Sequence, residues 1–180
     1  MQRLTLGLAA YGRHFALRNN NDHFYNAPCK KGDDDTYAGR PGTYLYDKKY
    51  ILSYYEICEK LSSFGWKREW INDYDIYAYG ESEWVGYDDQ ESLWTKVELA
   101  KTNNLAGLAW RSLDLDDFTG QFCGQGTYPL IRESLLAWAG TTTSSTTTRT
   151  TASTTESWDS KNLTWTFNND SLYISKKHDK

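Results

Sequence analysis

Three aspartates within four residues, Asp114, Asp116 and Asp117, are the most obvious candidates for chemistry in this sequence. A pair of carboxyl groups can act as a general acid and a general base. These three directly follow an apolar stretch that is predicted to be a strand. Aspartates in that place more often bond to nearby backbone N–H groups, as turn and helix-capping devices. We therefore expect a structural role for them.

The cysteines and histidines do not predict a metal site, because they form neither a CxxC nor an HxxxH spacing. They are Cys29, Cys58, Cys123, His14, His23 and His178. The run from Asp33 to Asp35 lacks the glycine and the terminal glutamate of a calcium loop and indicates a solvated turn. We expect no metal ion and no cofactor. An odd number of cysteines leaves one thiol free or paired outside this chain.

The elements that would position these residues alternate between strand and helix. Leu4–Ala10 is a continuous apolar run, as is typical of a buried parallel strand. Glu91–Asn104 has helical spacing, Leu105–Leu113 is a second apolar strand, and Pro129 begins a helix that Gly140 ends. This order predicts a parallel strand pair with a crossover, whose carboxyl ends form the functional edge.

Residues 14–83 are too many for a strand-to-helix loop, which usually takes about 2–6 residues. They contain a helical run over Ser53–Leu61 and many aromatic residues. We interpret them as a small inserted α+β subdomain that stands over the end of the sheet.

The composition changes at Gly140, and we expect the domain to occupy residues 1–140. Of residues 141–157, 14 of 17 are Ser or Thr, which predicts a disordered linker, either O-glycosylated or simply solvated. Residues 158–180 form a tail with glycosylation sequons at Asn162 and Asn169 and one short apolar alternation. The tail is too short to be a stable domain on its own.

The 180 residues carry a net charge of −4, which argues against a nucleic-acid partner. No apolar run is long enough to cross a membrane, and the amino terminus does not resemble a signal peptide. Aromatic residues make up 16% of the chain. So many rings are typical of a packed core, of an extended carbohydrate-like binding surface, or of both.

Five blocks of the sequence, in the same order and spacing, resemble glycoside hydrolase family 18, the chitinases and chitinase-like lectins. The blocks are Leu6–Phe15, Leu52–Cys58, Trp84–Asp89, Leu113–Phe118 and Cys123–Leu130. The resemblance covers residue 3 to about residue 139. It implies an α/β fold, the C-terminal portion of a (β/α)8 barrel with the family's insertion domain.

The family's acidic signature, Asp-x-x-Asp-x-Asp-x-Glu, does not occur in this sequence. In family members its glutamate protonates the glycosidic oxygen while the acetamide of the substrate attacks the anomeric carbon. Without that glutamate we expect no catalytic residue and no chitin hydrolysis by the chain as written.

The resemblance also implies roles for individual residues. Tyr11 and Arg13 match side chains that point into the sugar cleft, and Glu56 matches a glutamate that hydrogen-bonds a bound sugar. Trp84 matches a residue expected to pack between the insertion domain and the barrel. Cys58 and Cys123 match a cysteine pair that is bridged in many members, which would leave Cys29 over.

The sequence departs from the family at the floor of the central sugar subsite. An alignment without gaps puts Arg111 at the position of the family's tryptophan, and Trp110 falls one residue early. A shift of one residue along a strand turns a side chain to the opposite face. We therefore expect Trp110 to face the surrounding helices and Arg111 the cleft. An arginine lacks the flat apolar face of an indole, but it can hydrogen-bond an acetamide.

These features favour an extracellular protein that binds chitin or N-acetylglucosamine oligosaccharides, with no nucleic-acid or membrane partner and with its signal peptide outside this chain. Two alternatives stay open. The chain is the C-terminal fragment of an active endochitinase, or it belongs to a secreted glycoprotein that binds another protein. Two barrel strands leave unpaired edges, so we also expect the isolated chain to be marginally stable.

Overall fold

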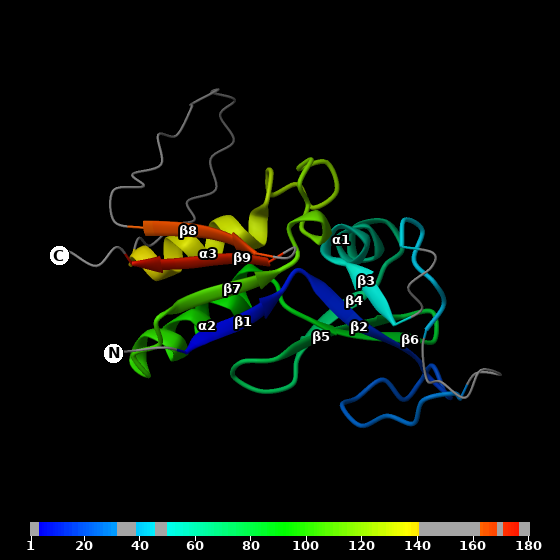
Figure 1. Cartoon of the computed structure of the whole chain (residues 1–180). Coiled ribbons are helices and arrows are strands. Elements are labelled where there is room, and N and C mark those ends of the chain that lie inside the picture. The colour runs from blue at the N-terminus through cyan, green and yellow to red at the C-terminus, as the bar shows by residue number, and fades with distance from the viewer. Residues whose placement is uncertain (1–3, 32–38, 46–49, 141–162, 169–170, 177–180) are drawn as a thin grey trace, which may run out of the picture.

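The computed structural model describes residues 4–31, 39–45, 50–140, 163–168 and 171–176. Two sheets lie side by side and are joined where the chain bends at Ala10 (Figure 1). The strands are β1 Thr5–Ala9, β2 Tyr11–Ala16, β3 Ile51–Ser53, β4 Lys67–Trp70, β5 Ile76–Gly80, β6 Glu83–Tyr87, β7 Gly107–Arg111, β8 Leu163–Asn168 and β9 Ser171–Lys176. The helices are α1 Tyr54–Ser63, α2 Gln90–Thr102 and α3 Pro129–Ala139, with a 3-10 turn over Leu113–Leu115.

The first sheet contains the predicted parallel pair. β1 lies beside β7 in parallel, with Ala9 in register with Arg111 and Leu8 with Trp110. Leu8, Leu108 and Trp110 belong to the main core cluster together with residues of α2 and α3. The predicted order of strand, crossover helix, parallel strand and final helix is therefore confirmed.

The second sheet is antiparallel, with the strand order β3-β2-β6-β5-β4. It begins at Tyr11 and ends at Tyr87, three residues before and four residues after the bounds expected for the inserted subdomain. Helix α1 packs against this sheet at Gly12, where an added Cβ would lie 2.3 Å from a methyl carbon of Val85 and 2.9 Å from Ile57. Only glycine allows so close an approach at this position.

The ends of the helices follow from the sequence. Ser53 caps α1 in a capping box with Glu56, and Asp89 caps α2 in the same manner with Ser92. Helix α3 starts with Pro129 and ends at Gly140, whose φ of 79° lies in the left-handed region.

The C-terminal tail forms two strands, whereas its sequence shows only one short apolar alternation. β8 and β9 pair antiparallel with each other, and β9 also pairs antiparallel with β7, with Ser171 opposite Arg111 and Ser175 opposite Gly107. The first sheet therefore has the order β1-β7-β9-β8. We expected this edge of β7 to be unpaired, but β9 of the tail pairs with it and β8 adds a further strand beyond β9.

Several sequence predictions fall outside the described residues. They concern the Ser/Thr-rich linker, both sequon asparagines Asn162 and Asn169, and the turn predicted over Asp33–Asp35. None of the helices in the described part of the chain is long and apolar enough to cross a membrane.

Candidate functional site

Two polar side chains at the start of β2 open into a cavity of about 470 Å³. They are Tyr11 and Arg13, which alternate with the buried Gly12 and therefore share one face of the strand. Ala9, at the end of β1, lines the same cavity. The other lining residues are Tyr25, Ile71, Asn72, Asp75, Ile76, Gly86, Tyr87, Asp88 and Lys96.

Tyr11 and Arg13 make no side-chain hydrogen bond or ion pair within the part of the chain that the structure describes. Arg13 is exposed and Tyr11 is half-buried. A free guanidinium and a free phenol can therefore donate hydrogen bonds into the cavity, and the Tyr11 ring offers an apolar face.

An ion network forms another part of the cavity wall. The Lys96 ammonium lies 2.7 Å from Asp88 Oδ1 and 3.1 Å from Asp75 Oδ1. Burial alone would lower the pKa of Lys96, but the two carboxylates outweigh it and raise the pKa above its usual value. These three charges neutralise one another in part, and together they tie α2 to the loop before β5 and to the end of β6.

The last two residues of β7 point to opposite sides, as predicted. Trp110 is 1% exposed, and its indole N–H donates to Ser134 Oγ on α3 at 3.1 Å. The prediction that Trp110 faces the helices is therefore confirmed. Arg111 is exposed and in register with Ala9, which lines the cavity, but Arg111 itself is not one of the lining residues. Its contact with a sugar stays a prediction. The Arg111–Ser112 peptide bond is cis.

Glu56 is buried, and both of its carboxylate oxygens are already hydrogen-bonded. Oε1 accepts from the backbone N–H groups of Tyr44 and Leu45, at 2.8 and 3.3 Å, and Oε2 accepts from Ser53 N and Oγ, at 2.9 and 3.0 Å. Glu56 thus holds the segment before β3 against the start of α1. Its contact with a sugar stays a prediction, which would require some of these bonds to be exchanged.

The aspartates after β7 organise the backbone, as the sequence suggested. Asp116 accepts from the N–H groups of Leu130 and Ile131, both at 3.1 Å, and so caps α3 from a distance. Burial raises the pKa of Asp116 to about 6 against the effect of these bonds.

The neighbouring Asp117 accepts from the N–H groups of Gly120, Phe122 and Cys123 at 2.8–3.0 Å. Both carboxylates are therefore occupied by backbone donors. Asp114 differs, because it is exposed and accepts from the Ser112 hydroxyl.

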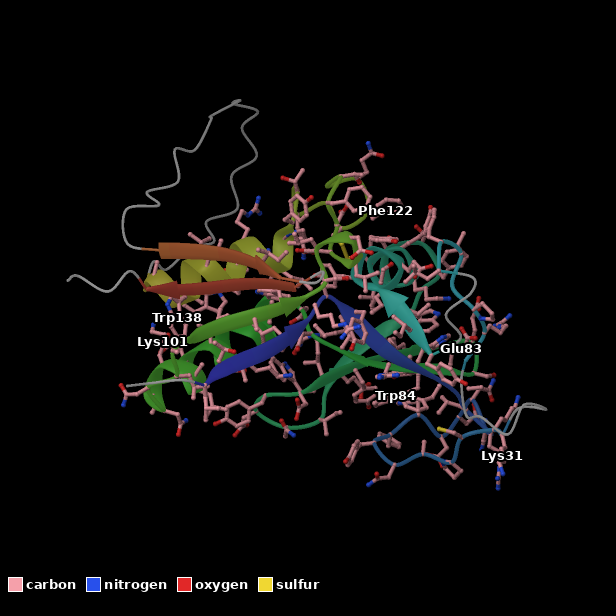
Figure 2. All side chains as sticks on the ribbon, viewed as in Figure 1. Lys31, Glu83, Trp84, Lys101, Phe122 and Trp138 are labelled. Carbon is pink, nitrogen blue, oxygen red and sulfur yellow. A yellow bond between two sulfur atoms is a disulfide. The ribbon has the colours of Figure 1, made fainter. Side chains whose placement is uncertain are left out.

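Cys58 on α1 and Cys123 form a disulfide, as the resemblance implied, and Cys29 is free. The bridge ties α1 to the loop that Asp117 organises. Phe122, labelled in Figure 2, lies next to Cys123 at the α1 side of the molecule, where its ring centroid is 5.3 Å from that of Tyr55.

Trp84 packs against aromatic residues of its own sheet, and its packing between the insertion domain and the barrel stays a prediction. It lies on β6 within the second sheet (Figure 2), where its ring stacks on Tyr77 at 5.3 Å and tilts against Phe15 at 5.9 Å. The described contacts of this side chain thus lie inside the sheet, because in-register neighbours on β2 and β5 are also aromatic.

The sequence did not identify several residues of the cavity wall, among them Tyr25, Asn72, Asp75 and Lys96. They come from two loops and a helix that are distant from Tyr11 in the sequence. Asp88 lies inside the family-like block Trp84–Asp89, and its place in that block could have marked it as a residue of the site. Within the described residues no group of three or more metal-ligating side chains is suitably placed to hold a metal ion.

Comparisons with known proteins agree with this architecture. Residues 1–116 match the model of the glycosyl hydrolases family 18. The chain is 42% identical over 132 residues to chitotriosidase-1 of Mus musculus, which covers 72% of this chain and 26% of that protein.

Two solved structures are similar in both sequence and fold. Human YKL-39, described as a pseudo-chitinase with retained chitooligosaccharide binding, is 34% identical with a TM-score of 0.68, over 77% of this chain and 35% of that one. Catalytic domain 2 of the Group II chitinase of Ostrinia furnacalis is 31% identical with a TM-score of 0.69, over 78% and 36%. The chain thus spans about a quarter to a third of these proteins.

Proposed function

Because the chain belongs to the glycosyl hydrolases family 18, we propose that it binds N-acetylglucosamine oligosaccharides of chitin at the face that carries Tyr11, Arg13 and Arg111. The observation that carries this proposal is the cavity lined by Tyr11 and Arg13. The Tyr11 hydroxyl and the Arg13 guanidinium have no hydrogen-bond or ion-pair partner among the described residues. The chitooligosaccharide binding described for human YKL-39 supports the same ligand class.

Each residue of this face contributes a different interaction. The Tyr11 ring packs against a pyranose face while its hydroxyl bonds to a ring substituent. The guanidinium of Arg13 donates to hydroxyl or acetamide oxygens from its rigid fork. Arg111 extends the same surface beyond Ala9 and donates to an acetamide carbonyl. Lys96, fixed by Asp75 and Asp88, keeps the wall in place.

We further propose that the chain as written binds without hydrolysis. The signature that supplies the acid in the family is absent from the 180 residues. Asp116 and Asp117 accept backbone hydrogen bonds instead of facing the cavity. Arg111 stands where the family has the tryptophan of the central subsite, and it cannot provide the same stacking surface.

Titration with neutral chitotetraose, followed by isothermal calorimetry, tests this proposal. We expect saturable binding, and Arg13→Gln should weaken it by about tenfold or more, since a hydrogen bond to a charged group contributes about 1.5–3 kcal/mol. Arg18→Gln is the matched control, because Arg18 is exposed and lies beyond the far end of β2. Binding that Arg13→Gln and Arg18→Gln weaken equally would contradict a site on this face.

Two other functions remain as alternatives. The similarity to mouse chitotriosidase-1 supports a role as the C-terminal part of a chitin-hydrolysing enzyme. A transcript that encodes the acidic signature upstream of Met1 would establish this role. A secreted glycoprotein that binds another protein would instead fail to bind chitin beads. In each case we propose an extracellular location, which the disulfide between Cys58 and Cys123 supports because disulfides persist in oxidising compartments.

A further inference from the structure

We propose that the face of Tyr11, Arg13 and Arg111 selects acidic amino-sugar chains, in which N-acetylglucosamine alternates with a uronic acid, over neutral chitin oligosaccharides. The inference rests on the proposed function, because it concerns the same sugar-binding face. It is carried by the two unpaired guanidinium groups at the two ends of that face.

Both arginines lack a compensating charge. Arg13 and Arg111 are exposed, and neither makes a side-chain hydrogen bond or ion pair in the described part of the chain. Other cations are different: Arg68 contacts Asp89 and Glu91, and Arg40 contacts Glu81 and Glu83. The protein therefore leaves two strong donors without an ion-pair partner, although the whole chain has a net charge of −4.

The carboxylates near this face form no ion pair with the two arginines. Asp75 and Asp88 line the cavity but lie within 3.1 Å of the Lys96 ammonium. Asp114, three residues after Arg111, accepts from the Ser112 hydroxyl. Among Arg13, Lys96, Asp75 and Asp88 the charges sum to zero, and Arg111 adds one positive charge beside them.

The spacing of the two arginines suits an extended ligand. Arg111 is in register with Ala9, so one strand spacing of about 4.8 Å separates their backbones. From Ala9 to Arg13 the chain advances four residues, at most about 14 Å. Tyr11 lies between Ala9 and Arg13 in the sequence, and all three residues line the same cavity. A sugar chain that packs on Tyr11 therefore passes a guanidinium on each side.

This arrangement fits carboxylates better than neutral hydroxyl groups. A guanidinium binds a carboxylate through two parallel hydrogen bonds, and such charge-assisted bonds are roughly twice as strong as neutral ones. A tryptophan at the position of Arg111 would instead favour a neutral, stacked pyranose ring. The exchange of one residue on β7 thus changes the preferred ligand from neutral to acidic.

The test compares two tetrasaccharides on the full 180-residue chain by calorimetry. One is neutral chitotetraose, and the other alternates N-acetylglucosamine with glucuronate. We expect the acidic tetrasaccharide to bind about tenfold more tightly at low salt, and we expect 0.5 M NaCl to remove most of that advantage. Arg111→Gln should abolish the preference, because it should weaken binding of the acidic tetrasaccharide about tenfold more than it weakens binding of chitotetraose. Arg111→Lys, which keeps the charge but loses the fork, should retain part of it.

Each outcome decides a different point. If chitotetraose binds as well as or better than the acidic chain, the inference is wrong and the proposed function stands. If only the acidic chain binds, the inference stands and chitin is not the ligand. If neither binds, both fail. An equal loss in the Arg18→Gln control would mean that diffuse charge decides the preference, and it would also overturn the inference. If a variant does not fold, the salt dependence of the unmodified chain decides the same question.

Discussion

Glu83 is 3% exposed, and its carboxylate is surrounded by nitrogen-bearing side chains from three parts of the fold. His14 Nε2 on β2 lies 3.4 Å away, Arg40 Nε 3.0 Å and Lys60 Nζ on α1 3.6 Å. Glu83 lies on β6 in the second sheet (Figure 2) and does not line the Tyr11 cavity. Burial opposes the ionisation of Glu83, but the hydrogen bonds from His14 and Arg40 outweigh it and lower the pKa to about 2.

A lowered pKa makes this carboxylate a source of acid sensitivity. Its contribution to stability is complete above the unfolded pKa of about 4.5 and is lost as the pH falls toward 2. A shift of this size corresponds to about 3 kcal/mol. We expect the free energy of unfolding, measured with urea, to fall more between pH 6 and pH 3 for the unmodified chain than for Glu83→Gln. Equal slopes would show that Glu83 does not carry this pH dependence.

β7 shows how one strand carries a buried and an exposed side chain next to each other. Trp110 packs under α3 and donates to Ser134, whereas Arg111 on the other face is exposed. The alternation of a strand therefore allows an arginine at position 111, because the side chain of Trp110 points the other way and still fills the core.

Alanine substitutions on β7 test this separation. Trp110→Ala should lower the free energy of unfolding by about 3–5 kcal/mol, since it removes a fully buried ring. Arg111→Ala should change it by less than about 0.5 kcal/mol, as is usual for an exposed position. Chemical denaturation of both variants gives the comparison. A large loss for Arg111→Ala would place that side chain in the core packing instead.

The disulfide between Cys58 and Cys123 joins two elements that are distant in the sequence. Cys58 and Cys123 are 65 residues apart in the sequence, and the bridge holds α1 against the loop after β7. Because α1 also packs on Gly12 of β2, the bridge fixes the second sheet relative to the end of the first.

We expect the Cys58→Ser/Cys123→Ser double variant to lose about 4 kcal/mol of stability, the chain-entropy value for a loop of this length. Cys29→Ser is the matched control, because Cys29 is free, and it should leave the denaturation midpoint unchanged. Guanidinium titrations with and without a reductant provide the measurement. If the reductant destabilises only proteins that contain Cys29, this assignment is wrong.

At the scale of the whole molecule, the tail completes a sheet that would otherwise end at β7. β9 pairs with β7 over five residues, and β8 follows as the outer strand (Figure 1). β1, at the opposite side, has no partner on its outer edge among the described strands. A row of unpaired backbone groups at a strand edge promotes association with other chains.

Truncation after Gly140 should therefore expose β7 and cause self-association. We expect the truncated chain to form oligomers at concentrations at which residues 1–180 stay monomeric, as measured by size-exclusion chromatography with light scattering. A variant that shortens only the linker should behave as the full chain does. A truncated chain that is monomeric and equally stable would show that the tail does not protect this edge.

The sequence by itself determined the order and type of the main elements, the parallel pair of β1 and β7, the capping role of the aspartates after β7 and the opposite directions of Trp110 and Arg111. These features follow from apolar periodicity, capping residues and strand alternation, which are properties of neighbouring residues. The prediction of the disulfide and the assignment of Tyr11 and Arg13 to the sugar cleft came from the family resemblance.

Only the tertiary structure decided which loops line the cavity and that Glu56 accepts hydrogen bonds from the backbone of residues 44 and 45. It also decided that His14, Arg40 and Lys60 surround Glu83 and that β9 pairs with β7. In each case the partners are separated by loops and come from different elements. Local pattern carries no information about such contacts, because the free energy that selects them depends on the packing of the whole molecule.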